Sequence, residues 1–468
     1  MIHKYLYSLF LILFLGVNAQ EQDKVILNFK EYLGYVKKYH PIAKQAELKI
    51  DMGQANLMRS RGGFDPKIEV DYDRKEFKGT EYYDRLNAAF KIPTWYGLEL
   101  KGNFEQNDGS YLNPSENVPD DGLYSAGVSM SVGQGFWINE RMATLKQAKL
   151  LREQTKADRD LQVNQVLFEA SIAYFQWLQD YQDSQILNNF FASAQMRFEG
   201  ILTTALAGEI AAIDTVEAKI AVQNRALDLE QAKVRFVKSS LELSNFLWLG
   251  DNLPVELKPN VIPDIYLGDD IDATLEILGK PLDSFNLENH PKLKSMGYKI
   301  DGLTIEKRLK ANKLLPKIDL EYNFLTSEPV AFNAFDDQDY KGGLSINLPL
   351  FLRKERGDLK LAKIKLEDAK FEMDNAEIQI KNKIVSIFKE LESFDKQNIL
   401  IEDIVGNYNI MLAAEERKFS YGESSLFLIN TRESKLIDAK LKQNEVQNKY
   451  YSAKAKLFNS LAVNPEKM

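Results

Sequence analysis

The chain has 468 residues, no cysteine and a formal net charge of −8 at pH 7. The lack of cysteine excludes disulfides and thiolate metal sites, and an acidic chain is a poor nucleic-acid binder. Only three histidines are present, and there is no glycine-rich phosphate loop. This leaves little material for a catalytic triad, a zinc site or a nucleotide site. We therefore expect a protein that is not an enzyme and that binds no cofactor and no metal.

The first 19 residues have the features of a secretory signal peptide. Lys4 precedes an apolar run from Tyr5 to Val17, and small residues lead to Ala19. The run is shorter than the roughly 20 apolar residues that span a bilayer. An uncleaved N-terminal anchor is the alternative. We expect cleavage after Ala19 and export of the remaining chain.

The rest of the chain is a tandem duplication. Four pairs of matching features share only two offsets, which indicates an internal repeat. The first copy carries the 36 extra residues (250 − 214), all between Pro66 and Asn139. The pairs 250 residues apart are His40-Pro41 with His290-Pro291, and "FDPKIEVDYD" (64–73) with "LLPKIDLEYN" (314–323); the pairs 214 apart are "NERMATLKQAK" (139–149) with "RKERGDLKLAK" (353–363), and Gly208 with Gly422.

Each copy is predicted to contain a lead-in helix kinked at His-Pro, a strand region and a long helical hairpin. The first repeat covers 20–249, and the second covers 290–468. A proline-rich linker or equatorial segment, 250–289, joins them. The strand regions lie at about 66–135 and 316–350, and the helical hairpins at about 139–248 and 353–462.

The strand regions alternate between apolar and polar residues. Ile318, Leu320 and Tyr322, for example, alternate with Asp319 and Glu321. Alternation of apolar and polar residues at every second position is typical of a half-buried soluble sheet. It is equally typical of a membrane barrel with lipid outside and water inside. The signal peptide and the lack of an apolar spanning helix favour the barrel. The first copy has four such runs, at roughly 67–74, 83–92, 97–106 and 123–133.

The helical regions are unusually long. No proline occurs from Trp137 to Leu253, nor from Leu350 to Asn464, and apolar residues follow a coiled-coil-like 3-4 spacing. A helix from Asn139 to Leu206 would be about 100 Å long. Several short helices folded into a bundle are the alternative, which the lack of turn signals disfavours.

Each long helical region is interrupted once, in "LAGEIAAIDTVEAK" (206–219) and "FSYGESSLFLINTRESK" (419–435). Gly208 and Gly422 are predicted to end the long helices with positive φ, and Ser424 or Ser425 to cap the next helix. An ordinary helix–helix turn without further role is the alternative to a functional tip.

These elements together resemble the TolC-like outer-membrane efflux channel family. The resemblance covers essentially the whole exported chain, and it is carried by the order of the HP entries, proline-led strands, "LKQAK"/"LKLAK" helix openings and paired glycine turns. It implies an α+β homotrimer whose strands form a barrel in the outer membrane and whose helices form a tunnel through the periplasm. It also implies a passive exit duct, in a tripartite efflux or type I secretion system, docked to a periplasmic adaptor and an inner-membrane pump.

The resemblance also identifies candidate gate residues and two departures from the family. The family commonly has acidic residues at the positions of Leu428 and Thr431, and a basic residue at the position of Ser424. In the first copy, Asp214 and Glu217 hold the equivalent acidic positions, three residues apart on one helix face. In the family, the basic residue can hold the tip closed by pairing with an aspartate of the first copy. Asp214 matches this aspartate, but its basic partner is absent. Its substitute partners are Arg417 and Lys418, one turn before Gly422.

The 36 extra residues are the second departure. They add either two strands to the barrel or a longer hairpin that folds over on the extracellular side. We favour the folded-over hairpin, because the family's usual two strands per copy give a twelve-stranded barrel in a trimer.

Two other functions compete with the channel. A periplasmic coiled-coil adaptor would have one helical hairpin, whereas this chain has two. A structural cell-envelope protein would not need alternating strands repeated in register with the helices. A channel needs detergent for extraction and runs as a trimer, and an adaptor largely does not.

Overall fold

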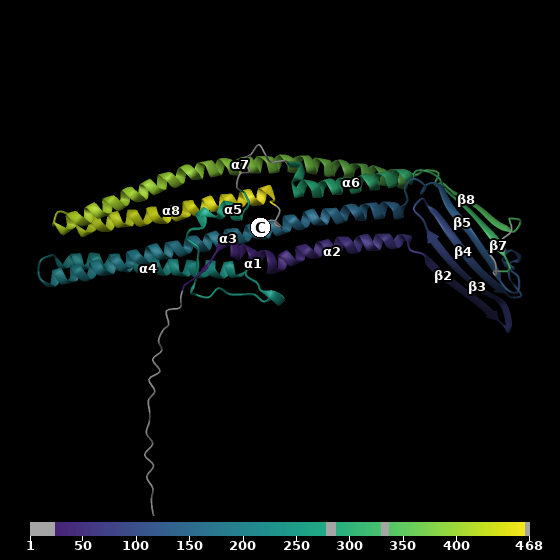
Figure 1. Ribbon diagram of the computed structural model, residues 1–468, viewed down its shortest axis with the longest axis horizontal. Coiled ribbons are helices and arrows are strands. Elements are labelled where there is room, and N and C mark those ends of the chain that lie inside the picture. Colours follow the sequence, from purple (N-terminus) through teal and green to yellow (C-terminus); the bar gives the residue numbers. More distant parts are fainter. Residues whose placement is uncertain (1–23, 278–286, 329–336, 464–468) are drawn as a thin grey trace, which may run out of the picture.

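A computed structural model describes residues 24–277, 287–328 and 337–463. The predicted signal peptide lies outside the described residues. The molecule is elongated, with long helices side by side over most of its length and one sheet at the far end (Figure 1). None of the described helices is long and apolar enough to cross a membrane.

The two repeats have the same order of elements: lead-in helix, strands, long helix and returning helix. The first repeat contains α1 (Phe29–Tyr39), α2 (Pro41–Arg61), β2 (Lys67–Phe77), β3 (Thr80–Pro93), β4 (Leu98–Asp108), β5 (Leu123–Gly133), α3 (Glu140–Leu206) and α4 (Ala212–Ser244). The second contains α6 (Pro291–Asn312), β7 (Lys317–Thr326), β8 (Tyr340–Asn347), α7 (Arg353–Ser420) and α8 (Leu426–Leu461).

The strands form one antiparallel sheet in the order β2-β3-β4-β5-β7-β8. The preference for a folded-over extracellular hairpin is therefore wrong for the described chain. β2 and β3 pair along their whole length, and β3 pairs with β4 from Asp84 to Pro93. Backbone pairing of this extent makes the extra hairpin a continuation of the sheet, because each strand satisfies its neighbour's N–H and C=O groups.

The register places apolar residues on one face of all six strands. Across the sheet, Ala88 lies opposite Phe104, Val128 opposite Tyr322, and Ile318 opposite Ile346. The other face is charged and is crossed by the ion pairs Lys101–Glu321, 3.6 Å, and Arg85–Asp73, 3.6 Å. No described helix covers the apolar face, and Leu344, Ile346 and Ile68 are exposed on it.

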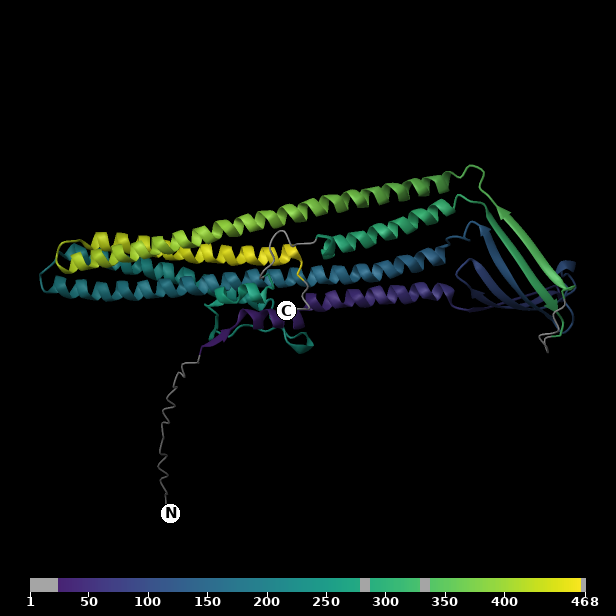
Figure 2. The same cartoon turned by 45° about the horizontal axis from the view of Figure 1, so that its top comes forward.

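The helices next to the sheet repeat the order of the strands. α2 packs on α3, α3 on α6, and α6 on α7, so α2 and α7 are the outer members of a curved layer (Figure 2). α3 has 67 residues and α7 has 68, which corresponds to about 100 Å each. The chain therefore has a four-helix layer that continues a six-stranded sheet.

The largest core lies halfway along the molecule, where α1, α3, α4 and α8 converge. Trp177, Tyr174 and Phe175 of α3 are buried there against Phe29 of α1 and Phe458 of α8. The segment between the repeats crosses this level: β6 (Val261–Pro263) pairs in parallel with β1 (Val25–Leu27), and α5 (Ile271–Thr274) follows. The described part of this segment is therefore folded against the equator of the molecule.

The two His-Pro pairs begin helices rather than kink them. His40 has extended backbone dihedrals, φ −62° and ψ 133°, and its Nδ1 accepts from the Ile42 amide. The His290 Nδ1 caps α6 in the same way by accepting from the Lys292 amide. A proline occupies the first helical position of both α2 and α6. Proline suits that position because its missing N–H has no helical partner there. The expected kinked lead-in helix is thus two helices, α1 and α2, in the first repeat.

Candidate gate at the hairpin tips

Both hairpin tips turn at a glycine in the left-handed region. Gly208 has φ +81° and Gly422 has φ +78°. The amide of Glu209 donates to the Thr204 carbonyl, 3.2 Å, and that of Gly208 to Ala205, 3.0 Å. Glu423 and Gly422 repeat this pattern on Lys418 and Phe419, at 2.9 and 3.0 Å. Both long helices therefore end in a Schellman turn, in which glycine avoids the strain that a Cβ would impose.

Ser424 and Ser425 are the two alternative residues predicted to cap the helix after Gly422. Ser425 is the N-cap residue of α8, but its side chain makes no capping hydrogen bond. The Ser424 hydroxyl instead donates to the Glu415 carboxylate of α7. A bond to an ionised acceptor is stronger than one to a backbone amide, which accounts for this choice. Ser425 is therefore the N-cap residue, as one of the two predicted alternatives, but it makes no side-chain capping bond.

The predicted gate residues lie near the tips on the two shorter helices. Asp214 lies in the first turn of α4, and Glu217 accepts from the Asn430 amide of α8 at 3.4 Å. On α8, Leu428 is exposed, and the Thr431 hydroxyl donates to the Phe427 carbonyl, 2.8 Å. Glu217 thus lies between the two hairpins, and Leu428 faces away from the packed interior of a single chain.

The substitute basic partners do not reach Asp214 within one chain. Arg417 and Lys418 are both exposed, and within the described residues of one chain neither forms an ion pair. A lock between them and Asp214 therefore remains a hypothesis that would require contact between copies.

A buried charged contact near the tips involves residues that the sequence did not indicate. Glu433 of α8 is 2% exposed and lies between both helices of the first hairpin. Arg197 of α3 approaches its Oε2 at 2.7 Å, and Arg225 of α4 approaches its Oε1 at 3.3 Å. Arg225 also donates to the Ser434 hydroxyl at 2.8 Å. This Glu433 cluster (Arg197, Arg225 and Glu433) joins the second hairpin, α7 with α8, to the first hairpin, α3 with α4.

A second polar contact between the hairpins lies closer to the equator. Asp180 and Asp183 of α3 are both buried. Asn444 of α8 donates to Asp183 at 2.7 Å, and Gln176 donates to Asp180 at 3.1 Å. Burial raises the pKa of Asp180, and burial with the nearby Asp180 charge raises the pKa of Asp183 to about 6. Removing a carboxylate from water disfavours its charged form.

We expect the pH dependence of stability to reveal Asp183. Its pKa is higher in the folded chain than the value near 3.9 of an unfolded one, so the folded state holds the proton more tightly. Stability therefore decreases as pH rises through about 6. Asp183→Asn should be more stable than the parent by about 3 kcal/mol at pH 7.5, and by only about half as much at pH 5, because the unfolded carboxyl is already ionised at pH 5.

Thermal unfolding of parent and variant at both pH values measures this difference. Asp180, Arg235 and Glu242 face the same region and are present in both proteins, so the comparison isolates the loss of the Asp183 carboxyl together with its effect on the neighbouring Asp180. An equal difference at both pH values would show that Asp183 does not titrate in this range.

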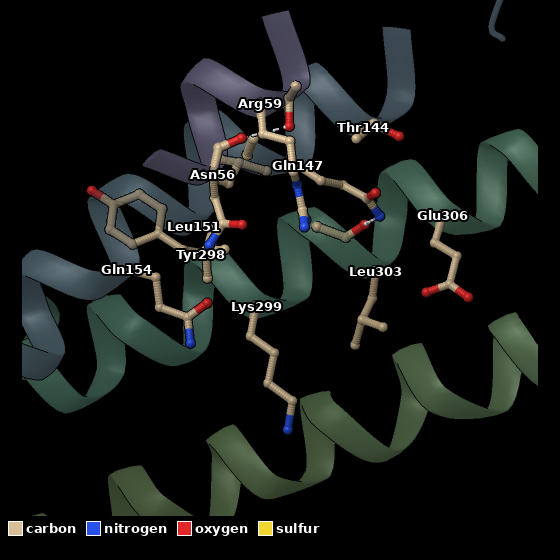
Figure 3. Close-up of a pocket in the computed structure, with 14 residues that line it drawn as sticks. Asn56, Arg59, Thr144, Gln147, Leu151, Gln154, Tyr298, Lys299, Leu303 and Glu306 are labelled. Carbon is tan, nitrogen blue, oxygen red and sulfur yellow. Dashed lines mark hydrogen bonds between the residues drawn. The ribbon is translucent and has the colours of Figure 1, made fainter. Parts of the chain in front are cut away.

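A groove lies nearer the sheet, where the two repeats meet (Figure 3). Its volume is about 330 Å³, and it is lined by α2, α3 and α6. Gln147 donates to the Gly302 carbonyl at 3.1 Å, and Lys299 pairs with Glu372 of α7 at 2.8 Å. No group of three potential metal ligands occurs among the described residues. The Gln147 bond thus joins the two repeats, and the Lys299 pair joins two helices of the second repeat.

Comparisons with known proteins show what the chain is similar to. Residues 284–463 match the family model "Outer membrane efflux protein". The match covers most of the second repeat, so this part of the chain is similar to the outer membrane efflux protein family. No protein with a curated description is detectably similar in sequence.

The fold of the chain is similar to that of solved outer membrane channels. It is similar to the CmeC channel of Campylobacter jejuni, with 13% identity and a TM-score of 0.65 over 93% of this chain and 85% of that chain. It is also similar to VceC of Vibrio cholerae, with 11% identity and a TM-score of 0.64 over 93% of this chain and 96% of that chain. The open state of MtrE of Neisseria gonorrhoeae is similar too, with 11% identity and a TM-score of 0.65 over 93% of this chain and 88% of that chain. Identities this low establish the fold alone.

Proposed function

We propose that three copies of the chain form a passive exit duct through the outer membrane and periplasm, as the last component of a tripartite efflux or type I secretion system. The observation that carries this function is the sheet, whose apolar face is continuous over six strands and is covered by no described helix. An uncovered apolar face of this size is stable against lipid and unstable in water.

The helical layer gives the duct its length. α2, α3, α6 and α7 continue directly from the sheet, and α3 and α7 run without interruption to the tips (Figure 1). α2 and α7 are the two outer helices of this layer. Rotation of copies about one axis would place α7 of one copy beside α2 of the next and so close a ring. Three copies are proposed because the family resemblance implies a homotrimer.

The tips would meet the periplasmic adaptor. Leu206, Ile213, Tyr421 and Phe427 are exposed at the tips of a single chain. Exposed apolar side chains in this number indicate an interaction site. We propose that an adaptor's helical hairpins bind here and connect the duct to an inner-membrane pump.

Extraction and mass measurement test this proposal. We expect the exported chain to stay with outer membranes during an alkaline carbonate wash, to need detergent for release, and to have the mass of a trimer in native mass spectrometry. Release by the wash as a monomer with intact helix content would instead support the periplasmic adaptor.

Neutralising Asp214 and Glu217 tests the predicted acidic mouth. In a trimer these residues would give six carboxylates around the tip opening, which would concentrate cations and repel anions. Asp214→Asn with Glu217→Gln is expected to lower cation preference in single-channel recordings and to weaken block by trivalent cations from the periplasmic side. Glu230→Gln is the control on the same helix, because Glu230 is exposed, pairs with the exposed Lys233 and lies away from the tip.

Unchanged selectivity and block in an assembled double variant would show that these two residues are only surface. Glu217 also accepts a hydrogen bond from Asn430, so the double variant could disturb the packing of the hairpins. Native mass spectrometry must therefore show that the variant is still a trimer.

A further inference from the structure

The first repeat contributes four strands to the sheet, and the second contributes two. β2 and β8 are the two edges, and each pairs on one side only within the described chain. They have 11 and 8 residues, long enough for a full seam of backbone hydrogen bonds. Open edges of this length attract another strand, because their N–H and C=O groups lack partners.

The extra hairpin has the same apolar face as the other strands. Ile68 lies opposite Phe90, Val70 opposite Ala88, and Ile68 and Val70 are exposed. The register continues these residues into the apolar face of β4, where Phe90 meets Gly102 and Ala88 meets Phe104. A hairpin lying in water outside the barrel would have no need of an uncovered apolar face aligned with its neighbours.

The apolar face of the hairpin ends where charges begin. Beyond Tyr72, Arg74 pairs with Glu81 at 2.7 Å, and the Tyr72 hydroxyl donates to Asp84 at 3.1 Å. A polar end above an apolar band, with an aromatic residue at the boundary, is the arrangement of strands at a membrane surface. β2 and β3 therefore cross the same apolar layer as the other four strands.

The two edges are compatible with each other. β2 leaves the helices and β8 returns to them, because the six strands alternate in direction. β8 of one copy would thus lie antiparallel to β2 of the next, as barrel closure requires. The same rotation brings α7 beside α2 of the next copy, so both layers close at one seam.

We propose that the barrel has eighteen strands, six from each of three copies, and that β8 of each copy pairs with β2 of a second copy. This inference rests on the proposed trimer. It differs from the twelve-stranded barrel that the family resemblance implied.

The extra strands change the width of the pore. Eighteen strands about 4.8 Å apart and tilted by about 40° give a backbone radius of about 18 Å, whereas twelve give about 12 Å. Twelve helices packed about 9 Å apart form a ring of radius about 17 Å. The wider barrel therefore matches the helical tunnel in radius.

Cysteine cross-linking tests the seam, and the natural chain has no cysteine to interfere. Ser345→Cys on the charged face of β8 is combined with one cysteine on the same face of β2, at Glu69, Asp71 or Asp73. Three positions are used because the register across the seam varies with barrel shear. The matched controls combine Ser345→Cys with a cysteine on β4, at Lys101, Asn103 or Glu105. Membranes are oxidised and analysed by non-reducing electrophoresis.

We expect at least one β2–β8 combination to form reducible covalent dimers and trimers, and the β4 combinations to form none. β4–β8 cross-links would overturn the proposal in favour of a twelve-stranded barrel with the extra hairpin outside. An intact trimer without any β2–β8 cross-link would also overturn it. Loss of the trimer in the cysteine-free parent would instead contradict the proposed function.

Discussion

Replacing Glu433 with alanine is expected to loosen the second hairpin from the first near the tips. The change leaves Arg197 and Arg225, whose side chains are 17% and 11% exposed, without their shared carboxylate. Removing one member of a buried charge cluster costs about 3 kcal/mol, because the remaining charges stay poorly solvated. Amide exchange in α8 near Glu433 should therefore become about 100-fold faster.

Glu445→Ala is the matched control on the same helix. Glu445 pairs with Lys442 and Lys449, and all three side chains are well exposed, so its loss should cost less than about 1 kcal/mol. Equal exchange rates in the two variants would contradict the idea that the Glu433 cluster fastens the hairpins. If the cluster also restrains the gate, Glu433→Ala should raise the single-channel open probability, and Glu445→Ala should not.

An arginine on the apolar face of the sheet is expected to impair membrane insertion. Ile346 is exposed on that face opposite Ile318, and Leu320 lies opposite Leu344. Ile346→Arg or Leu320→Arg should destabilise the inserted protein by about 2–4 kcal/mol near the bilayer midplane, because lipid cannot solvate the charge. The amount of heat-resistant trimer in outer membranes measures the effect.

Ser345→Arg provides the control, since Ser345 is next to Ile346 on the same strand and on the opposite, charged face. We expect this variant to insert normally. Removing Asp319 or Glu321 from the charged face should likewise have a mild effect. Equal loss of trimer in Ile346→Arg and Ser345→Arg would mean that the assignment of the two faces is wrong.

The sequence predicted those features that depend on local pattern. Long proline-free runs predicted α3 and α7, and period-two alternation predicted each of the six strands. Such patterns report which face of an element is buried, and they do so without knowledge of its partners. The alternation at 67–74 and 83–92 is as regular as elsewhere, but the expected family strand number led us to place this hairpin outside the barrel.

The features that the sequence did not predict depend on contacts between distant residues. Glu433 and Arg197 are 236 positions apart (433 − 197), and nothing in the local sequence distinguishes Glu433 from the exposed acidic residues of α8. Ser424 lies one residue before the N-cap position, and the spatial approach of Glu415 determines the partner of its hydroxyl. An ion cluster buried between hairpins is found only after the hairpins have been placed together.

The most direct test of the account is electrical recording from the purified detergent-extracted protein in a planar lipid bilayer. If the chain forms an exit duct, its addition should produce stable unitary conductance steps with a preference for cations. Protein that inserts as a trimer and yet gives no conductance under any voltage, including when the Glu433 cluster is removed, would contradict the conclusion that the chain is a channel.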